Sequence, residues 1–276
     1  MTTPQVADEV LAYYSTRFDE HARLASSAAG VLELVRTQEL LRRYLPTAPA
    51  RVLDVGGGPG AHARWLVEDG YRVHLVDPVE RHVREAAGAG CTVEVGDARS
   101  LSAADASYDV VLLLGPLYHL PELPDRARVL AEALRVVRPG GLVVASGIQR
   151  FAALFDHAAH GRLHLDGREE RSGRVLASGV NEGREFTFAY FHRAEELAAE
   201  VRGAGIDGAR LYGVEGPGDS MLKAAEAATG LQVPQESDLF VSALAAARLA
   251  ESHPELLVAS SHLLVFGHRP GQAALS

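Results

Sequence analysis

The sequence has a single cysteine, Cys91, among its 276 residues. One cysteine excludes an intramolecular disulfide and every metal site that needs several cysteine ligands. It lies in the apolar stretch CTVEV, which predicts a buried thiol on a strand. Three histidines, His157, His160 and His164, have no accompanying cysteine, and their spacing matches no ligand set. We therefore predict no metal centre.

Long apolar runs and a surplus of basic residues are also missing. Runs such as VVLLL at 110–114 are far too short to span a bilayer, and MTTPQVADEV at the start lacks the features of a signal peptide. The net charge of -9 argues against a nucleic-acid partner. We predict a cytoplasmic monomer or homodimer that acts on a small molecule, with neither nucleic acid nor membrane as partner.

The overall composition is that of a folded globular protein. Apolar residues make up 47% of the chain and charged residues 23%, which excludes collagen-like, disordered and disulfide-rich classes. The length suits one large domain, or one domain with a lid, better than two independent ones. We therefore expect residues 1–276 to form a single domain.

Short runs rich in valine and leucine alternate with helical patterns along the first half of the chain. Continuous apolar runs of this length predict strands that are covered on both faces, and alternation with helices predicts right-handed crossovers in a parallel sheet. The fold class is therefore α/β with a doubly wound sheet. The runs are RVLDV (51–55), RVHLV (72–76), CTVEV (91–95), YDVVLLL (108–114) and GLVVAS (141–146).

The flanking segments have other patterns. Residues 5–45 are helical in pattern, the regular alternation lapses after Gly147, and it returns with a helix at 192–205 and strands at 208–216 and 261–269. We divide the domain into an N-terminal helical cap (1–48), a cofactor-binding core (49–148), a lid insertion over the substrate (149–190), and the C-terminal part of the sheet with a helical insert (191–276).

The stretch VLDVGGGPG at 52–60 carries the strongest functional signal. A strand that runs through a glycine-rich turn into a helix offers free backbone N–H groups and the positive helix end to a ligand at the carboxyl edge of the sheet. Gly56, Gly58 and Ala61 satisfy G-x-G-x-x-A, and Asp77 lies 21 residues beyond Gly56. This segment alone leaves NAD and other adenosine-containing cofactors open.

Three further features distinguish between these cofactors. Asp54 stands two residues before the first glycine, where its carboxylate would repel a pyrophosphate and attract a cation. Asp97 follows the third strand in GDARSL, and YDVVLLLGPLYHL is followed by VVRPGGLVV. From Arg51 to Ile148 this order of motifs resembles the class I S-adenosylmethionine-dependent methyltransferases. The similarity is to the broad group of small-molecule, ubiquinone-methyltransferase-like (type 11) enzymes.

The resemblance implies a Rossmann-like seven-stranded sheet whose last strand is antiparallel and lies between the fifth and sixth, a place for 261–269. It also implies that Asp54 and the glycine loop approach the methionine part of S-adenosylmethionine, Asp77 takes both ribose hydroxyls, and Asp97 takes the adenine amine. The full set of implied cofactor residues is Asp54, Gly56, Gly57, Gly58, Gly60, Asp77, Pro78, Asp97, Ala98, Leu114 and Gly115.

Methyl transfer from a sulfonium is an in-line displacement that needs alignment and a dry site, and a base only when the acceptor must lose a proton. His119 is our candidate base. The resemblance implies that the N-terminal helix caps the cofactor, and we expect its Tyr14 to approach the methyl group as the second catalytic residue. Both could instead only shape the pocket by packing. Residues expected to contact the substrate are Tyr13, Phe18, Tyr118 and His192.

The sequence therefore predicts an S-adenosylmethionine-dependent methyltransferase that acts on a small-molecule acceptor, with the O, N or C acceptor atom left open. One alternative is a NAD-dependent oxidoreductase, which leaves Asp54 and Asp97 without a role. The other is a partner subunit that binds the cofactor without catalysis.

Overall fold

The computed structural model describes residue 14 and residues 23–183 and 186–271. Tyr13 and Phe18, two of the predicted substrate contacts, lie outside the described residues. The strands are β1 (Arg51–Val55), β2 (Arg72–Asp77), β3 (Thr92–Val95), β4 (Tyr108–Leu113), β5 (Val137–Gln149), β6 (Val180–Glu182), β7 (Phe188–His192), β8 (Asp207–Gly213) and β9 (His262–His268).

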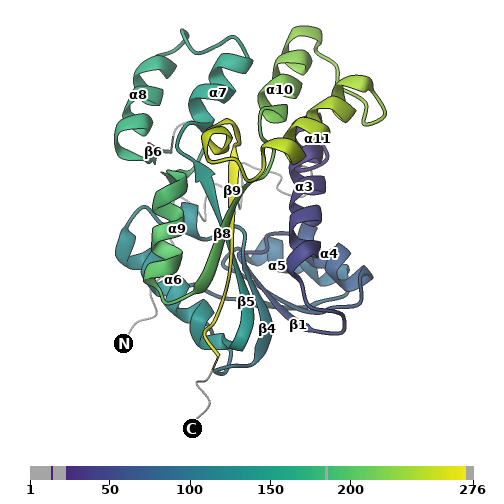
Figure 1. Ribbon diagram of the computed structural model, residues 1–276, viewed down its shortest axis with the longest axis vertical. Coiled ribbons are helices and arrows are strands. Elements are labelled where there is room, and N and C mark those ends of the chain that lie inside the picture. Colours follow the sequence, from purple (N-terminus) through teal and green to yellow (C-terminus); the bar gives the residue numbers. More distant parts are fainter. Residues whose placement is uncertain (1–13, 15–22, 184–185, 272–276) are drawn as a thin grey trace.

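Helices connect and cover these strands (Figure 1). They are α3 (Ala28–Tyr44), α4 (Ala61–Glu68), α5 (Glu80–Ala86), α6 (Leu123–Val136), α7 (Ala152–Ala159), α8 (Arg168–Ser178), α9 (Ala194–Gly203), α10 (Gly218–Thr229) and α11 (Asp238–Ala250). Three short 3-10 helices are η1 (Ala87–Ala89), η2 (Leu117–His119) and η3 (Pro254–Ala259). No helix in the described part of the chain is both long and apolar enough to span a membrane.

The sheet confirms the predicted doubly wound architecture. Strands β3, β2, β1, β4 and β5 lie side by side in that order and pair in parallel. Strand β9 runs antiparallel to both β5 and β8, so it lies between them. The last strand therefore occupies the place that the sequence predicted for 261–269, despite the long connection that precedes it.

Two strands were not predicted, and the described residues form nine strands rather than seven. Strand β5 continues to Gln149, past its predicted end, and its last two residues pair in parallel with Phe191 and His192 of β7. Strand β6 then pairs antiparallel with β7. The addition depends on this extension of β5, so no local pattern in the insertion indicates it.

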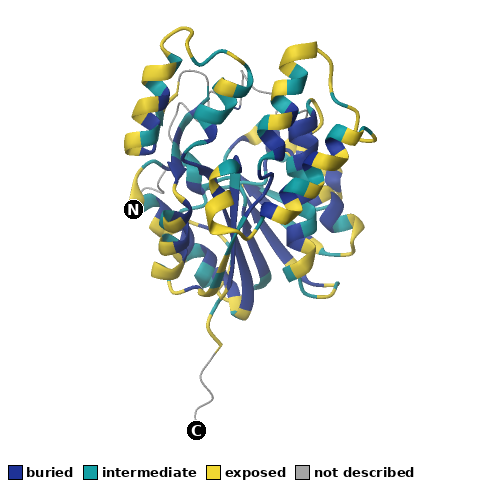
Figure 2. Cartoon of the chain, turned by 45° about the horizontal axis from the view of Figure 1, so that its top comes forward, coloured by how far each residue is buried: buried dark blue, intermediate teal, exposed yellow. Residues whose placement is uncertain are grey.

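Alternate residues of the central strands pack against helices on opposite faces of the sheet. Leu53 and Val111 belong to the core formed with α6 and α9, whereas their neighbours Val52 and Val110 belong to the core formed with α3 and α4. Figure 2 shows the central strands buried and the exposed residues on the outer helices. Burial on both faces explains why these strands read as continuous apolar runs.

Two local predictions need correction. The helical pattern over 5–45 is interrupted, because residues 24–27 form a turn and α3 begins only at Ala28, where the Ser27 hydroxyl accepts the Gly30 N–H at 3.0 Å. Cys91 is not a buried strand residue. It is half-buried, lies just before β3, and its thiol donates to the Ala86 carbonyl at 3.5 Å.

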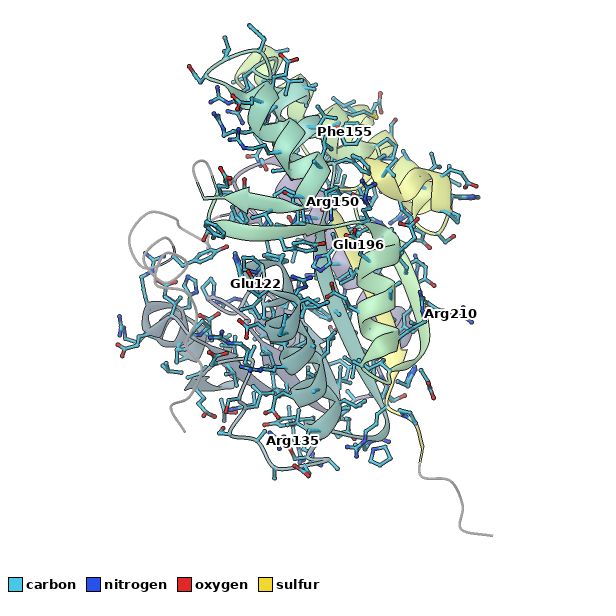
Figure 3. The ribbon with its side chains drawn as sticks, turned by 90° about the vertical axis from the view of Figure 1, so that its left-hand side faces the viewer. Glu122, Arg135, Arg150, Phe155, Glu196 and Arg210 are labelled. Atoms are coloured by element: carbon cyan, nitrogen blue, oxygen red, sulfur yellow. The ribbon has the colours of Figure 1, made fainter. Side chains whose placement is uncertain are left out.

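Helices α7, α8, α10 and α11 stand over the carboxyl ends of the parallel strands (Figure 1). Lys223 of α10, the chain's one lysine, joins two of them, α10 and α7: its Nζ lies 3.2 Å from Asp156 of α7 and 2.9 Å from Asp219 of its own helix. Below them, Arg150 at the end of β5 contacts Glu196 of α9 at 2.7 Å (Figure 3). The first pair links α7 to α10, and the second links the end of β5 to α9.

Candidate functional site

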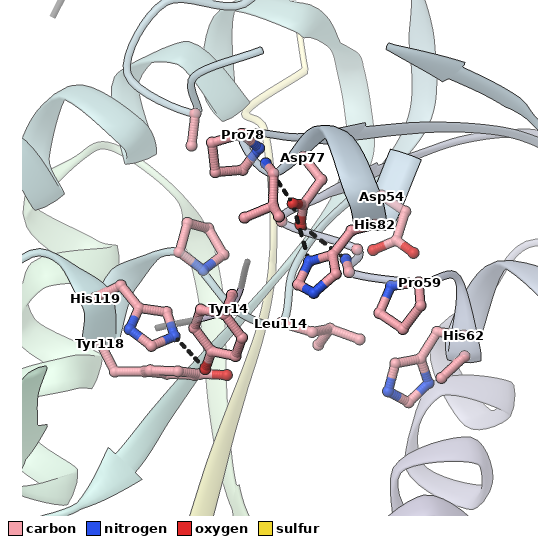
Figure 4. Close-up of a pocket in the computed structure, with 18 of the residues that line it drawn as sticks. Tyr14, Asp54, Pro59, His62, Asp77, Pro78, His82, Leu114, Tyr118 and His119 are labelled. Carbon is pink, nitrogen blue, oxygen red and sulfur yellow. Dashed lines mark hydrogen bonds and ion pairs between the residues drawn. The ribbon is translucent and has the colours of Figure 1, made fainter. Parts of the chain in front are cut away.

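A pocket of about 1050 Å³, measured with its open mouth, lies where β1, β2 and β4 end (Figure 4). Parallel strands with helices on both faces bring the loops after these strands to one edge, which is where ligands of such sheets bind. The predicted residues that line it are Tyr14, Asp54, Gly56, Gly57, Gly58, Asp77, Pro78, Asp97, Ala98, Leu114, Gly115, Tyr118 and His119.

Two predicted site residues do not line this pocket. Gly60 instead provides the N-cap of α4, with a φ of 86° that favours glycine. His192 is fully buried on β7, and its Nε2 lies 3.6 Å from Glu200 of α9. The pairing of β7 with β5 turns this histidine into the protein, away from the pocket.

Asp54, at the end of β1, is completely buried, and neither carboxylate oxygen has a hydrogen-bond partner among the described residues. Burial raises the pKa of its carboxyl to about 7, and the nearby Asp77 contributes to the rise. A Cβ atom at Gly57 would lie 2.6 Å from Asp54 Oδ2, so only glycine lets the loop pass this close. Such a carboxylate is suited to a cationic group and opposes a phosphate.

Asp77, at the end of β2, holds the glycine loop in place. Its Oδ2 accepts the Gly58 N–H at 2.9 Å, and its Oδ1 accepts the Val79 N–H at 2.9 Å. The Nδ1 of His82 lies 3.2 Å from the same Oδ1. The carboxylate therefore shapes the pocket and faces it at the same time.

Asp97 forms an ion pair with Arg99 that the sequence analysis did not predict. The Arg99 guanidinium pairs with both oxygens, at 2.7 Å to Oδ2 and 3.1 Å to Oδ1, and the Arg99 N–H also donates to Oδ1. Both side chains are nearly buried. The segment GDARSL could have indicated this pair, because the guanidinium of an arginine two residues after an aspartate can reach its carboxylate.

Tyr14 and His119 meet inside the pocket. The Tyr14 hydroxyl lies 3.0 Å from His119 Nε2, and the two rings pack edge to face (Figure 4). Tyr118 and Phe186 pack against the same imidazole. Burial lowers the pKa of His119 to about 4, so the ring is neutral at pH 7 and can accept a proton.

A network of ion pairs that the sequence analysis did not predict forms another part of the pocket wall. Arg23 pairs with Glu33 of α3 through two contacts, at 2.6 and 2.8 Å. Burial acts to raise the pKa of Glu33, but Arg23 and His262 outweigh it and lower it to about 2. Burial acts to lower the pKa of His262, but Glu33 and Glu215 raise it to about 9.

Glu33, Glu215 and His262 are close enough to be considered as metal ligands, since their oxygen and nitrogen atoms lie within 4.8 Å of one another. The protonated His262 already donates to Glu215, and the Arg23 guanidinium occupies Glu33. Two positive groups therefore balance the two carboxylates. The chemistry of this cluster is that of an ion-pair network.

Comparison with known proteins agrees with this geometry. Residues 53–145 match the family described as Methyltransferase domain. A ubiquinone biosynthesis O-methyltransferase of Ralstonia nicotianae is 32% identical over 177 residues, which cover 62% of this chain and 68% of that protein. The chain belongs to the class I S-adenosylmethionine-dependent methyltransferases.

Solved structures of other methyltransferases share the fold. An S-adenosylmethionine-dependent methyltransferase from Thermotoga maritima superimposes with a TM-score of 0.59 at 20% identity, covering 94% of this chain and 99% of that one. A phosphoethanolamine N-methyltransferase of Haemonchus contortus, in complex with S-adenosyl-L-methionine, gives 0.53 at 16% identity over 90% of this chain and 59% of that one.

The choice of cofactor that the glycine loop alone left open is thus resolved in favour of S-adenosylmethionine. The pocket of the methyltransferase fits that group, because its buried and unpartnered carboxylate at Asp54 suits a ligand with an ammonium and a sulfonium. A NAD pyrophosphate at the same loop would meet this carboxylate without a neutralising partner.

Proposed function

We propose that this enzyme methylates a small-molecule acceptor beside the Tyr14–His119 pair. The observation that carries the proposal is the contact of these two side chains at 3.0 Å in the pocket that also holds Asp54. The net charge of -9 supports a small metabolite over a nucleic acid. In this proposal residues 1–48 act as the cap and 149–190 as the lid over the acceptor.

S-adenosylmethionine, when bound, supplies the methyl group. We assign Asp54 to the ammonium of its methionine part, Asp77 to the ribose, Asp97 and Ala98 to the adenine, and Leu114 with Gly115 to the floor. The chain's residues then act by position: Asp54 and Asp77 orient the ligand, and the surrounding apolar groups exclude water.

His119 takes a proton from the acceptor in this scheme. Its imidazole is neutral at pH 7 and has one lone pair on a ring nitrogen. When the Nε2–H donates to the Tyr14 hydroxyl, that lone pair lies on Nδ1, which takes the proton while Tyr14 fixes the ring. An acceptor whose nucleophilic atom carries no proton would need only the alignment. The acceptor identity therefore decides how much the pair contributes to the rate.

The cofactor assignment is tested by changing Asp77. We expect Asp77→Asn to weaken binding of S-adenosylhomocysteine by about a hundredfold, because hydrogen bonds to a carboxylate contribute roughly 1.5–3 kcal/mol each and the amide replaces one acceptor by a donor. Isothermal titration calorimetry measures the affinity. Asp207→Asn, at an exposed position at the start of β8, is the control. An unchanged affinity in Asp77→Asn would refute the assignment.

The raised pKa of Asp54 predicts that cofactor binding depends on pH. Below about pH 7 the free enzyme holds a proton on this carboxyl, and that proton must leave before a cation can pair with it. We expect affinity for S-adenosylhomocysteine to rise between pH 6 and 8 in the wild type. Asp54→Asn should bind more weakly at pH 8 and show no such rise.

The same pKa has a consequence for the free protein. Because the pKa is raised on folding, this group stabilises the fold fully below its unfolded value near 4, and that contribution is lost as pH rises through about 7. Unliganded Asp54→Asn should therefore lose less stability than the wild type between pH 5 and 8. Parallel pH profiles in the two proteins, for binding and for unfolding, would contradict this interpretation.

A further inference from the structure

His82, on the first turn of α5, is a pocket residue that the sequence reading did not single out. Its side chain is only 3% exposed. Its Nδ1 faces Asp77 at 3.2 Å, and its ring packs edge to face on Tyr14 with centroids 5.6 Å apart (Figure 4). It therefore lies between the proposed ribose-binding carboxylate and the proposed catalytic pair.

The hydrogen bonds of Asp77 leave it little capacity for a ligand. A carboxylate offers about four lone-pair positions. Gly58 uses one on Oδ2, and Val79 and His82 use two on Oδ1. One position therefore remains, on Oδ2, whereas a ribose presents two neighbouring hydroxyl groups. A second acceptor is needed close by if both hydroxyls are to be satisfied.

His82 has an unused hydrogen-bond acceptor of this kind. Its Nε2 is buried and has no hydrogen-bond partner among the described residues. When Nδ1 donates its hydrogen to Asp77, the neutral ring leaves Nε2 as an acceptor. A buried acceptor without a donor is unfavourable, and a ligand hydroxyl at this atom would remove that cost.

We infer that His82 is a cofactor-binding residue whose Nε2 accepts a hydrogen bond from one ribose hydroxyl, while Asp77 Oδ2 accepts from the other. The inference rests on the proposed placement of the ribose at Asp77 and adds a second residue to it. It predicts that two different side chains each bind one of the two hydroxyls. A ligand that lacks the hydroxyl bound by His82 should therefore show the same affinity whether or not His82 is changed.

Two variants distinguish the role of Nδ1 from that of Nε2 in the imidazole. His82→Asn keeps an amide donor near the position of Nδ1 and has no atom at Nε2, whereas His82→Gln places a carbonyl oxygen near Nε2. The affinities for S-adenosylhomocysteine and for its 2′-deoxy and 3′-deoxy analogues are measured by calorimetry. His74→Asn, on β2 and outside the pocket lining, serves as the matched control.

We expect His82→Asn to bind S-adenosylhomocysteine about tenfold more weakly than the wild type, and His82→Gln to lose less. For one of the two deoxy analogues, the wild type and His82→Asn should bind with equal affinity. The decisive result is that this analogue is not the one whose affinity Asp77→Asn leaves unchanged. A His82 that only holds Asp77 would lose its effect together with the hydroxyl that Asp77 binds, and one that only packs on Tyr14 would weaken all three ligands alike. The same insensitive analogue for both variants would overturn the inference.

An unchanged affinity of His82→Asn for S-adenosylhomocysteine would overturn the inference, and so would an equal loss for all three ligands. Either result leaves the proposed function intact as long as Asp77→Asn still weakens binding. If Asp77→Asn also binds normally, the ribose is not at this strand end, and the proposed placement fails together with the role of His82.

Discussion

His119→Ala should lower kcat by about 10²- to 10⁴-fold for an acceptor that loses a proton, since this is the usual contribution of a positioned general base. Affinity for S-adenosylhomocysteine should change only a few-fold, because the assigned cofactor contacts lie at Asp54 and Asp77. Tyr14→Phe should reduce kcat in the same direction by a smaller factor, because it keeps the ring and removes the hydroxyl that orients the imidazole. The acceptor comes from a screen of phenols, amines and activated carbon acids with detection of S-adenosylhomocysteine.

The control for this pair is Tyr71→Phe, which removes a hydroxyl that donates to the Pro46 carbonyl at 2.8 Å, outside the pocket. It should leave kcat unchanged. With the pKa of His119 at about 4, the imidazole is neutral from pH 6 to 8 and should cause no loss of rate in that range. Full turnover by His119→Ala at every pH would remove this residue from the chemistry and leave it a packing role.

Glu251→Gln should destabilise the fold by about 3 kcal/mol, because it leaves a buried charge with too few partners. The Arg36 side chain on α3 is fully buried and pairs with Glu39 and with Glu251, which follows α11. The amide substitution removes one of these charges while the guanidinium stays inside. Urea denaturation with a shared slope gives the change in the free energy of unfolding.

Two comparisons make this result specific. Glu80→Gln removes the partner of Arg84 in a pair whose side chains are 76% and 69% exposed, and it should cost less than about 0.5 kcal/mol. Combining Arg36→Met with Glu251→Gln should cost less than the sum of the two single changes, because the buried charge is then gone. Additive losses would mean that the two residues contribute independently and do not act as a buried pair.

The central fold could be predicted because its information is local. Continuous valine and leucine runs mark strands covered on both faces, and glycine at the end of β1 marks the turn into α4. Strands β6 and β7 could not be predicted in this way, because β7 pairs with an extension of β5 that lies 40 or so residues earlier in the chain. The position of His192 followed from that pairing and was missed for the same reason.

The candidate site likewise contains residues that local sequence patterns predict and residues that only long-range packing brings together. Asp54 lies near the end of a predicted strand, and Asp77 and Asp97 follow two others, so the shared carboxyl edge brings the three to one pocket. Arg23 and Glu33 come together with His262 only through the packing of α3 against the far end of the chain, which no local pattern indicates. His82 did have a local signal, because it lies in the first turn of α5, 5 residues after Asp77. Its vacant nitrogen is visible only in the folded protein.

The most direct test of the cofactor pocket is a thermal-unfolding comparison of the protein alone, with S-adenosylhomocysteine and with NADH. A ligand present at about 100 times its dissociation constant stabilises a protein by roughly 2.7 kcal/mol, which raises the midpoint of unfolding by several degrees. We predict such a shift with S-adenosylhomocysteine and none with NADH. A shift with NADH alone would contradict the assignment of Asp54 and show that the glycine loop binds a dinucleotide.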